Sequence, residues 1–158
     1  MESTPFLLAL GLGAWFVPGD HELYDALDGS HRSIGTAGSF ELRGSFVPHD
    51  AAHLELSGSL ARGREATLTS FSPQLNLGWT VTSMELRPGL ALGVSRHTVR
   101  GPTLGQDADW GRHAGLNLAV PLDEDWGFRV DARRTKMSAA ADGTTHHHAI
   151  TLSMTRSL

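Results

Sequence analysis

Glutamate, aspartate and arginine recur at alternate positions in several stretches of the chain. Glu41 is two residues from Arg43, and Arg129, Asp131 and Arg133 repeat that spacing. In a β-strand, residues two apart lie on the same face, where a planar guanidinium can pair with a carboxylate through two hydrogen bonds. We therefore predict an ion-pair network on one face of the strands. Its expected members are Glu41, Arg43, Glu55, Glu85, Arg87, Arg129, Asp131 and Arg133.

Histidines are the second group whose positions could carry chemistry. We expect His97 and His113 to lie opposite each other on neighbouring strands if the loop between them centres near Gly105. His147 would reach the same rim from the last strand. Imidazole nitrogens can bind a transition metal, but no carboxylate spacing completes a tetrahedral set. We expect no metal and no cofactor, and His97, His113 and His147 are the candidate ligands if a metal binds.

Ser95 and His97 are two residues apart and could serve as a nucleophile and a general base. Such a pair needs a carboxylate that orients the imidazole. The carboxylate expected on the same strand, Glu85, lies toward its opposite end. We therefore expect a protein that is not an enzyme, and an ester hydrolase is the alternative.

The elements that must hold these groups are β-strands, because apolar and polar residues alternate along nearly the whole chain. A short turn at 82–83 and another at 123–125 are expected, and the second places Asn117 opposite Asp131. A meander of eight antiparallel strands favours a closed up-and-down barrel. The strands are predicted over residues 5–16, 34–47, 53–61, 69–81, 84–99, 110–122, 126–138 and 146–158.

Chain length, net charge and composition limit the class of protein. With 158 residues we expect one domain spanning residues 1–158. A formal net charge of −4 gives no reason to expect a nucleic-acid partner, and the lack of cysteine excludes disulfides and thiolate metal sites. No apolar run reaches the roughly 18 residues of a transmembrane helix, whereas membrane strands need only about 9–11 residues of alternating character.

The face that points inward decides between two kinds of barrel. A soluble, lipocalin-like barrel that binds a ligand has an apolar interior, and a membrane barrel has the reverse arrangement. Three features favour the membrane barrel. The charges of the polar face balance, that face is rich in Gly, Ala and Ser, and aromatic residues of the apolar face lie toward strand ends, as in interfacial girdles. These aromatic residues are Phe16, Phe46, Trp79, Trp110 and Trp126.

With these features the chain resembles the small eight-stranded outer-membrane β-barrel proteins of the OmpX, OmpW and OmpA membrane-domain type. The resemblance lies in the alternating pattern and covers nearly the whole chain. The last strand keeps the pattern, although Leu158 stands where such barrels end in an aromatic residue. The resemblance implies an all-β, eight-stranded antiparallel up-and-down transmembrane barrel in the outer membrane of a Gram-negative bacterium, in contact with the lipid bilayer and lipopolysaccharide.

The expected function follows from a lumen filled with paired charges, which leaves no room for a general, porin-like pore. We expect a structural role, or an interaction role through the extracellular loops. Some barrels that the chain resembles act on lipid A acyl chains, so a lipid A hydrolase is the enzymatic alternative for Ser95 and His97. A protein partner would meet the longest loop, 18–33, where a helical turn at 22–27 fits. The candidate residues there are Asp20, His21, Glu22, Tyr24, Asp25, Asp28, His31 and Arg32.

Overall fold

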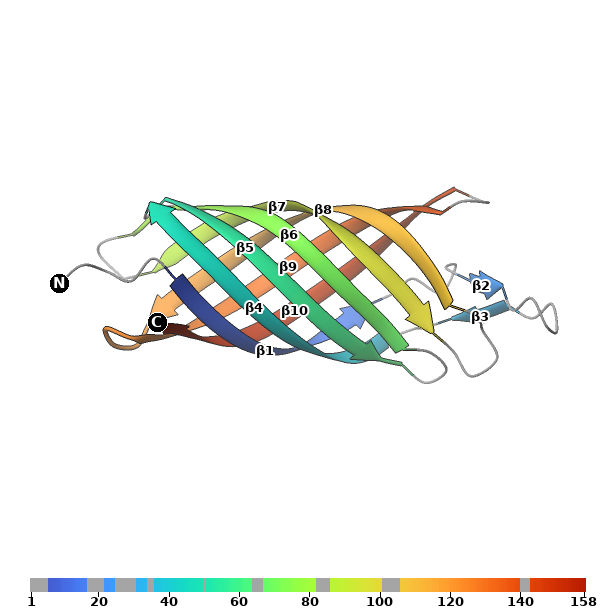
Figure 1. Cartoon of the computed structure of the whole chain (residues 1–158), viewed down its shortest axis with the longest axis horizontal. Coiled ribbons are helices and arrows are strands. Elements are labelled where there is room, and N and C mark those ends of the chain that lie inside the picture. The colour runs from blue at the N-terminus through green and yellow to red at the C-terminus, as the bar shows by residue number, and fades with distance from the viewer. Residues whose placement is uncertain are drawn as a thin grey trace.

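The protein is a closed β-barrel (Figure 1). The computed structural model describes residues 6–16, 22–24, 31–33, 36–49, 51–63, 67–81, 86–100, 106–139 and 143–158. The strands are β1 (Phe6–Phe16), β2 (Glu22–Tyr24), β3 (His31–Ser33), β4 (Thr36–His49), β5 (Ala52–Arg62), β6 (Thr67–Gly78), β7 (Arg87–Arg100), β8 (Gln106–Pro121), β9 (Trp126–Ala139) and β10 (Gly143–Ser157). Eight of them form the barrel, and β2 pairs with β3 in a separate sheet.

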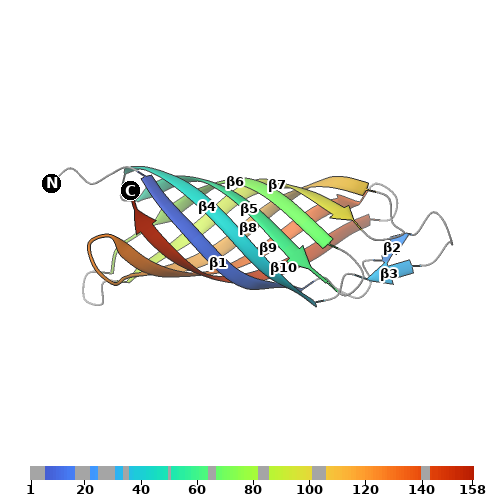
Figure 2. The ribbon, with the colours of Figure 1, turned by 60° about the horizontal axis from the view of Figure 1, so that its bottom comes forward.

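All neighbouring strands of the barrel are antiparallel. From β4 onward each strand pairs with the next one along the chain, β1 pairs with β4, and β10 closes the barrel against β1. The strands run obliquely around the barrel, as closure of a twisted sheet requires (Figures 1 and 2). The prediction of an eight-stranded antiparallel up-and-down barrel is confirmed.

Exposed and buried residues alternate along the barrel strands. On β4, Phe40 and Leu42 are exposed, whereas Glu41 and Arg43 are buried. Leu12, in the middle of β1, is 70% exposed. Apolar side chains therefore cover the outside and polar side chains fill the lumen. This is the arrangement predicted for the membrane barrel and the opposite of the lipocalin-like alternative.

The long segment after β1 contains a short hairpin in place of the helical turn that its sequence allowed. Leu23 pairs with Arg32 across β2 and β3. The helical turn is therefore wrong at 22–24, and residues 25–27 lie outside the described residues. A single helical turn fixes several residues for one hydrogen bond, whereas the hairpin gains cross-strand bonds over its length.

The connection between β6 and β7 is longer than the two-residue turn predicted at 82–83. Val81 pairs with Leu86, so residues 82–85 connect the strands and the predicted turn was wrong. Between the same strands the ladder is interrupted around Pro73, which has no N–H to donate, and the register is the same on either side.

The register of the later strands was predicted correctly in one hairpin and wrongly in another. Asn117 lies opposite Asp131 between β8 and β9, as expected. Between β7 and β8, His113 lies opposite Gly93, so the predicted facing of His97 and His113 is wrong. The reason is that β7 continues to Arg100 and β8 begins at Gln106, which centres their connection earlier than Gly105.

The two ends of the barrel differ in their connections. The start of β1 and the end of β10 lie at one end, together with the turn between β8 and β9, and the β2–β3 hairpin projects from the other (Figures 1 and 2). We call these the turn end and the loop end. Among the described residues, no helix is long and apolar enough to cross a membrane.

Candidate functional site

Six ionised side chains meet in the middle of the lumen, and we refer to them as the ion-pair network. Strand alternation points them inward from β4, β5 and β9. Three arginines against three carboxylates leave the network without net charge, which offsets part of the large cost of removing charges from water. Its members, all buried, are Glu41, Arg43, Glu55, Arg129, Asp131 and Arg133.

Arg43 is the centre of the ion-pair network. Its Nη2 donates a hydrogen bond to Glu41 Oε1 at 2.6 Å, and its Nη1 donates to Asp131 Oδ2 at 3.0 Å. Its Nε lies 3.2 Å from Glu55 Oε2. One guanidinium therefore connects β4, β5 and β9. A planar group with five N–H donors can serve three carboxylates at once, which a lysine ammonium does less well.

Arg129 and Arg133 complete the network from β9. Arg129 Nη1 lies 2.5 Å from Glu55 Oε1, and its Nη2 lies 2.7 Å from Asp131 Oδ1. Arg133 Nη2 donates to Glu41 Oε2 at 2.8 Å. Each carboxylate is thus shared by two arginines, so the six side chains act as one unit across the lumen.

Amide side chains extend the network toward β6 and β8. Asn76 Nδ2 donates a hydrogen bond to Glu55, and Asn117 Nδ2 donates to Asn76 Oδ1 at 3.0 Å. Gln74 Nε2 donates to the other oxygen of Glu55 at 3.4 Å. Only charged residues were predicted as members of the network. Alternate amides at 74 and 76, on the same face as the charges, were the signal that could have found these members.

One of the two other predicted members, Arg87, is placed away from the network. Arg87 is exposed at the start of β7 and lines a cavity of about 180 Å³ at the turn end. Arg43 and Arg129 also line this cavity, so its inner wall is the ion-pair network. Glu85 lies outside the described residues. The structure therefore brings six of the eight predicted side chains together.

The three candidate metal ligands are buried in the lumen, on the loop-end side of the ion-pair network. The ring centroids of His97 and His147 are 6.1 Å apart. His97 Nε2 lies 2.7 Å from Ser95 Oγ, and His113 Nε2 lies 3.0 Å from Gln74 Oε1. Among the residues that the structure describes, no three His, Cys, Asp or Glu side chains are placed to hold a metal ion.

Gly93 makes room for the ring of His113, which lies opposite it on β8. A Cβ atom on Gly93 would lie 2.7 Å from His113 Nε2 and 2.7 Å from Gln74 Cβ. Both distances are far below van der Waals contact. The bond between His113 and Gln74 therefore depends on a glycine at this position.

Ser95 and His97 form the hydrogen bond that their spacing suggested, but inside the barrel. Each is 1% exposed. Among the described residues, no carboxylate accepts a hydrogen bond from His97 Nδ1. A nucleophile that attacks a lipid must face the lipid, and this pair faces the lumen. The geometry supports a packing role for the hydrogen bond.

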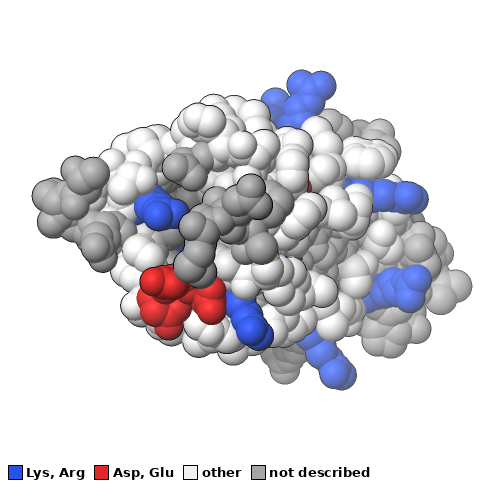
Figure 3. All heavy atoms as spheres, turned by 60° about the vertical axis from the view of Figure 1, so that its left-hand side comes forward, with Lys and Arg blue, Asp and Glu red and all other residues white. Residues whose placement is uncertain are grey.

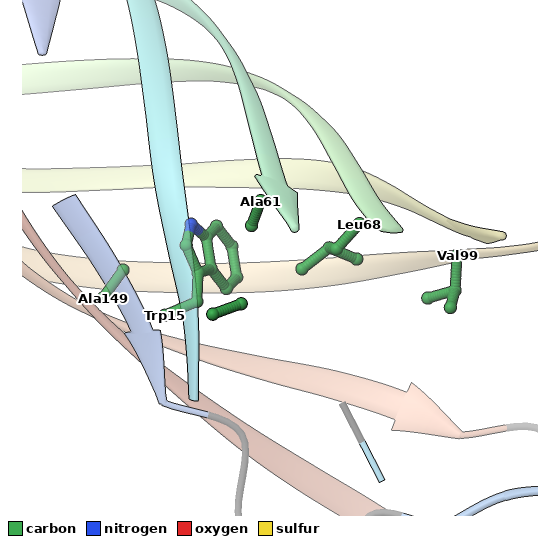
Figure 4. Close-up of a cluster of buried hydrophobic side chains, with 6 residues drawn as sticks. Trp15, Ala61, Leu68, Val99 and Ala149 are labelled. Carbon is green, nitrogen blue, oxygen red and sulfur yellow. The ribbon is translucent and has the colours of Figure 1, made fainter. Parts of the chain in front are cut away.

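An apolar cluster that was not predicted from the sequence lies toward the loop end of the lumen. Trp15 is 1% exposed and packs edge-on against His97 and His147, with ring centroids 5.4 Å and 6.2 Å away. Figure 4 shows Trp15 among small and aliphatic side chains from other strands. All of them occupy inward positions of the alternating pattern, which was the available signal. The Trp15 cluster consists of Trp15, Ala37, Ala61, Leu68, Val99 and Ala149.

The outside of the barrel carries an apolar band with aromatic residues toward both ends. The five predicted aromatic residues are between 39% and 58% exposed. Arg156, which interrupts the apolar face of β10, lies over the ring of Trp126 with its Cζ 5.2 Å from the ring centroid. A cation above an indole ring suits the edge of a membrane, where the arginine can reach the headgroups.

Charges on the outside are divided between the ends. Asp123, Glu124 and Asp125 are exposed in the turn between β8 and β9, and Figure 3, which looks toward the turn end, shows a compact acidic cluster. Arg87 and Arg156 are exposed near the same turn, whereas the other six exposed arginine and lysine side chains of the barrel strands lie toward the loop end. These six are Arg62, Arg96, Arg100, Arg112, Arg134 and Lys136.

Four of the eight candidate interaction residues of loop 18–33 lie in the part of the chain that the structure describes. The β2–β3 hairpin carries them beyond the loop end of the barrel (Figure 1). Tyr24 pairs with His31 through the backbone, and Glu22 pairs with Ser33. Arg32 is on β3. The remaining four, Asp20, His21, Asp25 and Asp28, lie outside the described residues.

The arrangement of the two faces defines the class of protein. An apolar band around the whole barrel would be costly in water, at roughly 25 cal/mol per Å² of apolar surface, and is stable in lipid. The barrel strands have 11 to 16 residues, enough for the 9–11 or so that a tilted strand needs to cross a bilayer. The fold is that of a transmembrane β-barrel.

Solved structures of similar fold are outer-membrane barrels. Neisserial surface protein A (NspA) matches with a TM-score of 0.72 and 8% identity over 100% of both chains. Ail, the attachment invasion locus protein of Yersinia pestis, solved with the heparin analogue sucrose octasulfate, matches with a TM-score of 0.63 and 14% identity over 100% of both chains. The outer membrane enzyme PagL matches with a TM-score of 0.53 and 12% identity over 96% of this chain and 99% of that one.

At these identities the likeness concerns the fold. No family model matches the chain, and no curated protein does. The expected resemblance to small eight-stranded outer-membrane barrels is confirmed at the level of the fold.

Proposed function

We propose that the protein is an outer-membrane barrel with a filled lumen, which acts as a structural or interaction protein through its surface loops. It spans the outer membrane of a Gram-negative bacterium with its turn end toward the periplasm, as the short turns of such barrels do. The observation that carries the proposal is the filling of the lumen. The ion-pair network occupies its middle, and the Trp15 cluster occupies its loop end.

A general pore does not suit this interior. Eight strands enclose a space just wide enough for side chains. Here that space holds salt bridges of 2.5 to 3.0 Å that cross from β4 and β5 to β9. The cavity of about 180 Å³ at the turn end stops at Arg43 and Arg129.

Planar-bilayer recording tests the filled lumen. The purified protein, inserted into a bilayer beside a large-lumen porin as the positive control, is expected to give no regular conductance steps. The reason is that ions would have to displace buried, paired charges. Conductance steps of one constant size would contradict the proposal if this protein gave them under the conditions in which the inserted porin gives its own steps.

The longest loop favours a partner with a basic surface. Residues 18–33 hold four carboxylates, Asp20, Glu22, Asp25 and Asp28, against one guanidinium, Arg32. The sulfated sugar found with Ail is a polyanion, and an acidic loop would repel such a ligand. Charge complementarity steers association and suppresses partners of like charge. A basic protein surface is therefore the better match for this loop.

Adhesion of bacterial cells to coated surfaces tests this part of the proposal. Cells that produce the protein should bind a polylysine coating better than cells that produce a variant with Asp20, Glu22, Asp25 and Asp28 changed to their amides. The matched control neutralises the acidic turn at 123–125, which faces the periplasm and should leave adhesion unchanged. If the loop variant adheres as well as the natural protein, or if heparin coatings are preferred, the loop does not carry the interaction.

The enzymatic alternative is less well supported. The Ser95–His97 hydrogen bond of 2.7 Å is its one favourable observation. Lipid acyl chains run along the outside of a membrane barrel, and this pair is separated from them by the barrel wall. We therefore assign Ser95 and His97 to the packing of the lumen.

A further inference from the structure

An apolar groove crosses the outside of the barrel on β8, β9 and β10. Its apolar lining includes the small outward residues Ala114 and Ala132 and the larger residues Leu116, Ile150 and Phe16. The groove has a volume of about 420 Å³. It follows the row in which Leu116 lies opposite Ala132 and Ala132 lies opposite Ile150. A depression lined in this way accepts an alkyl chain.

Basic side chains stand at the loop-end margin of this apolar groove. Arg134 and His148 line it and lie opposite each other on β9 and β10. One step farther toward the loop end, Lys136 lies between Arg112 on β8 and His146 on β10. Directly opposite residues have Cβ atoms about 4.5–5.5 Å apart, so these five side chains can converge on one ligand. We call them the basic rim: Arg112, Arg134, Lys136, His146 and His148.

Over the part of the chain whose side chains are described, no acidic residue lies beside the basic rim on the outside of the barrel. Among the acidic side chains that the structure describes, Glu41, Glu55 and Asp131 are in the lumen, and the others form the turn at 123–125, at the opposite end. Like charges directly opposite each other, such as Arg112 and Lys136, destabilise a sheet. An anion from outside the chain would remove this repulsion.

His146, at the edge of the basic rim, is affected by the neighbouring basic side chains. β10 has 15 residues, more than the roughly 9–11 needed to cross a bilayer, so His146 lies in its extension at the loop end. Desolvation and the positive charges of Arg134, Lys136 and His148 lower the pKa of His146 below its ordinary value. The positive charge of the rim is therefore carried by Arg112, Arg134 and Lys136.

We propose that the apolar groove and the basic rim together form a binding site for a phosphorylated, acylated glycolipid of the outer leaflet, that is, for the lipid A part of lipopolysaccharide. One acyl chain lies in the groove over Ala132, and a phosphate contacts Arg134 and Lys136. Arginine and lysine both bind phosphate, arginine through two parallel hydrogen bonds. The proposal rests on the proposed outer-membrane location and adds to it a specific lipid partner and its site.

Native mass spectrometry of the full chain with defined lipids tests this site. The probes are lipid A with both phosphates, lipid A without phosphates, and the zwitterionic lipid phosphatidylethanolamine. We expect the natural protein to retain bisphosphorylated lipid A at least tenfold more strongly than either other lipid. The double variant Arg134→Gln with Lys136→Gln should lose this preference, whereas Arg62→Gln with Arg100→Gln, which removes equal charge at the same end but outside the groove, should keep it.

A second pair of variants tests the apolar groove without changing charge. Ala132→Phe fills the groove with a ring and should weaken lipid A retention severalfold. Gly44→Phe adds the same ring on the outside of β4, where a Cβ meets nothing within 4 Å, and should leave retention unchanged. All variants must first show the heat-dependent gel shift of a closed membrane barrel. A natural protein that lacks this shift contradicts the proposed function itself.

Three results would overturn the lipid site in a correctly folded barrel. The first is equal loss of lipid A in both double variants, which would indicate general surface charge. The second is equal retention of lipid A with and without phosphates, which would leave only an apolar contact. The third is a dimer of the chain that Ala132→Phe abolishes, since the groove would then bind a second copy.

Discussion

Arg43 contacts three carboxylates, so its loss should be the most costly single change in the lumen. Arg43→Met leaves Glu41, Glu55 and Asp131 buried with one arginine fewer, and removing one partner of a buried ion pair costs about 3–5 kcal/mol. We expect the free energy of unfolding, measured by urea titration of the refolded protein in lipid, to fall by that amount. Arg87→Met, at an exposed position, should change it by less than about 0.5 kcal/mol. Equal midpoints for the two variants would contradict the network.

From the sequence, the face on which a charged residue lies was easier to predict than the residue with which it forms an ion pair. Alternation alone assigns Glu41, Arg43 and Asp131 to one face. The contact between Arg43 and Asp131 joins residues 88 positions apart and depends on how the closed barrel is staggered. The Trp15 cluster was missed for a related reason, because inward apolar residues on separate strands become a cluster only after closure.

At the scale of the strand, the assignment of faces predicts where a charge is tolerated. Leu152, in the middle of β10, is 55% exposed and lies between Leu12 and Val130, whereas Leu122, also 55% exposed, borders the turn at 123–125. Leu152→Arg should cost about 2–4 kcal/mol in lipid, and Leu122→Arg about 0–1 kcal/mol. Refolding into lipid vesicles, followed by urea titration, measures both. If Leu152→Arg is tolerated as well as Leu122→Arg, the outward face of β10 does not meet lipid.

The register between two strands was predictable where their connection is short and its residue types indicate a turn. Asp123 Oδ1 accepts hydrogen bonds from the backbone N–H groups of Asp125 and Trp126, which fixes the turn and sets Asn117 opposite Asp131. The connection between β7 and β8 has no such marker. A shift of its pairing that preserves both faces is compatible with the same alternation, so the sequence could not place His113.

At the scale of the whole molecule, the barrel separates three environments. Its outer band meets apolar chains, and its lumen holds a neutral set of ion pairs. The exposed charges of the strands and the 123–125 turn are uneven, with three acids in that turn and six of the eight exposed arginine and lysine side chains of the strands toward the loop end. A filled lumen and a membrane-facing apolar band were both predictable from alternation and composition. The uneven distribution of charge between the ends was not predicted, because it depends on which end of each antiparallel strand lies at which end of the closed barrel.

The central claim is that the apolar face meets lipid, and the four tryptophans allow a direct test. Trp15 is 1% exposed in the lumen, whereas Trp79, Trp110 and Trp126 are 56%, 58% and 39% exposed on the outside. Single-tryptophan variants, with the other three changed to Phe, can be refolded into vesicles of lipids brominated near the headgroup end of the acyl chain. Bromine quenches indole fluorescence on contact. We predict that the three outer tryptophans are quenched and that Trp15 is not; quenching of Trp15 with the other three unaffected would contradict the account.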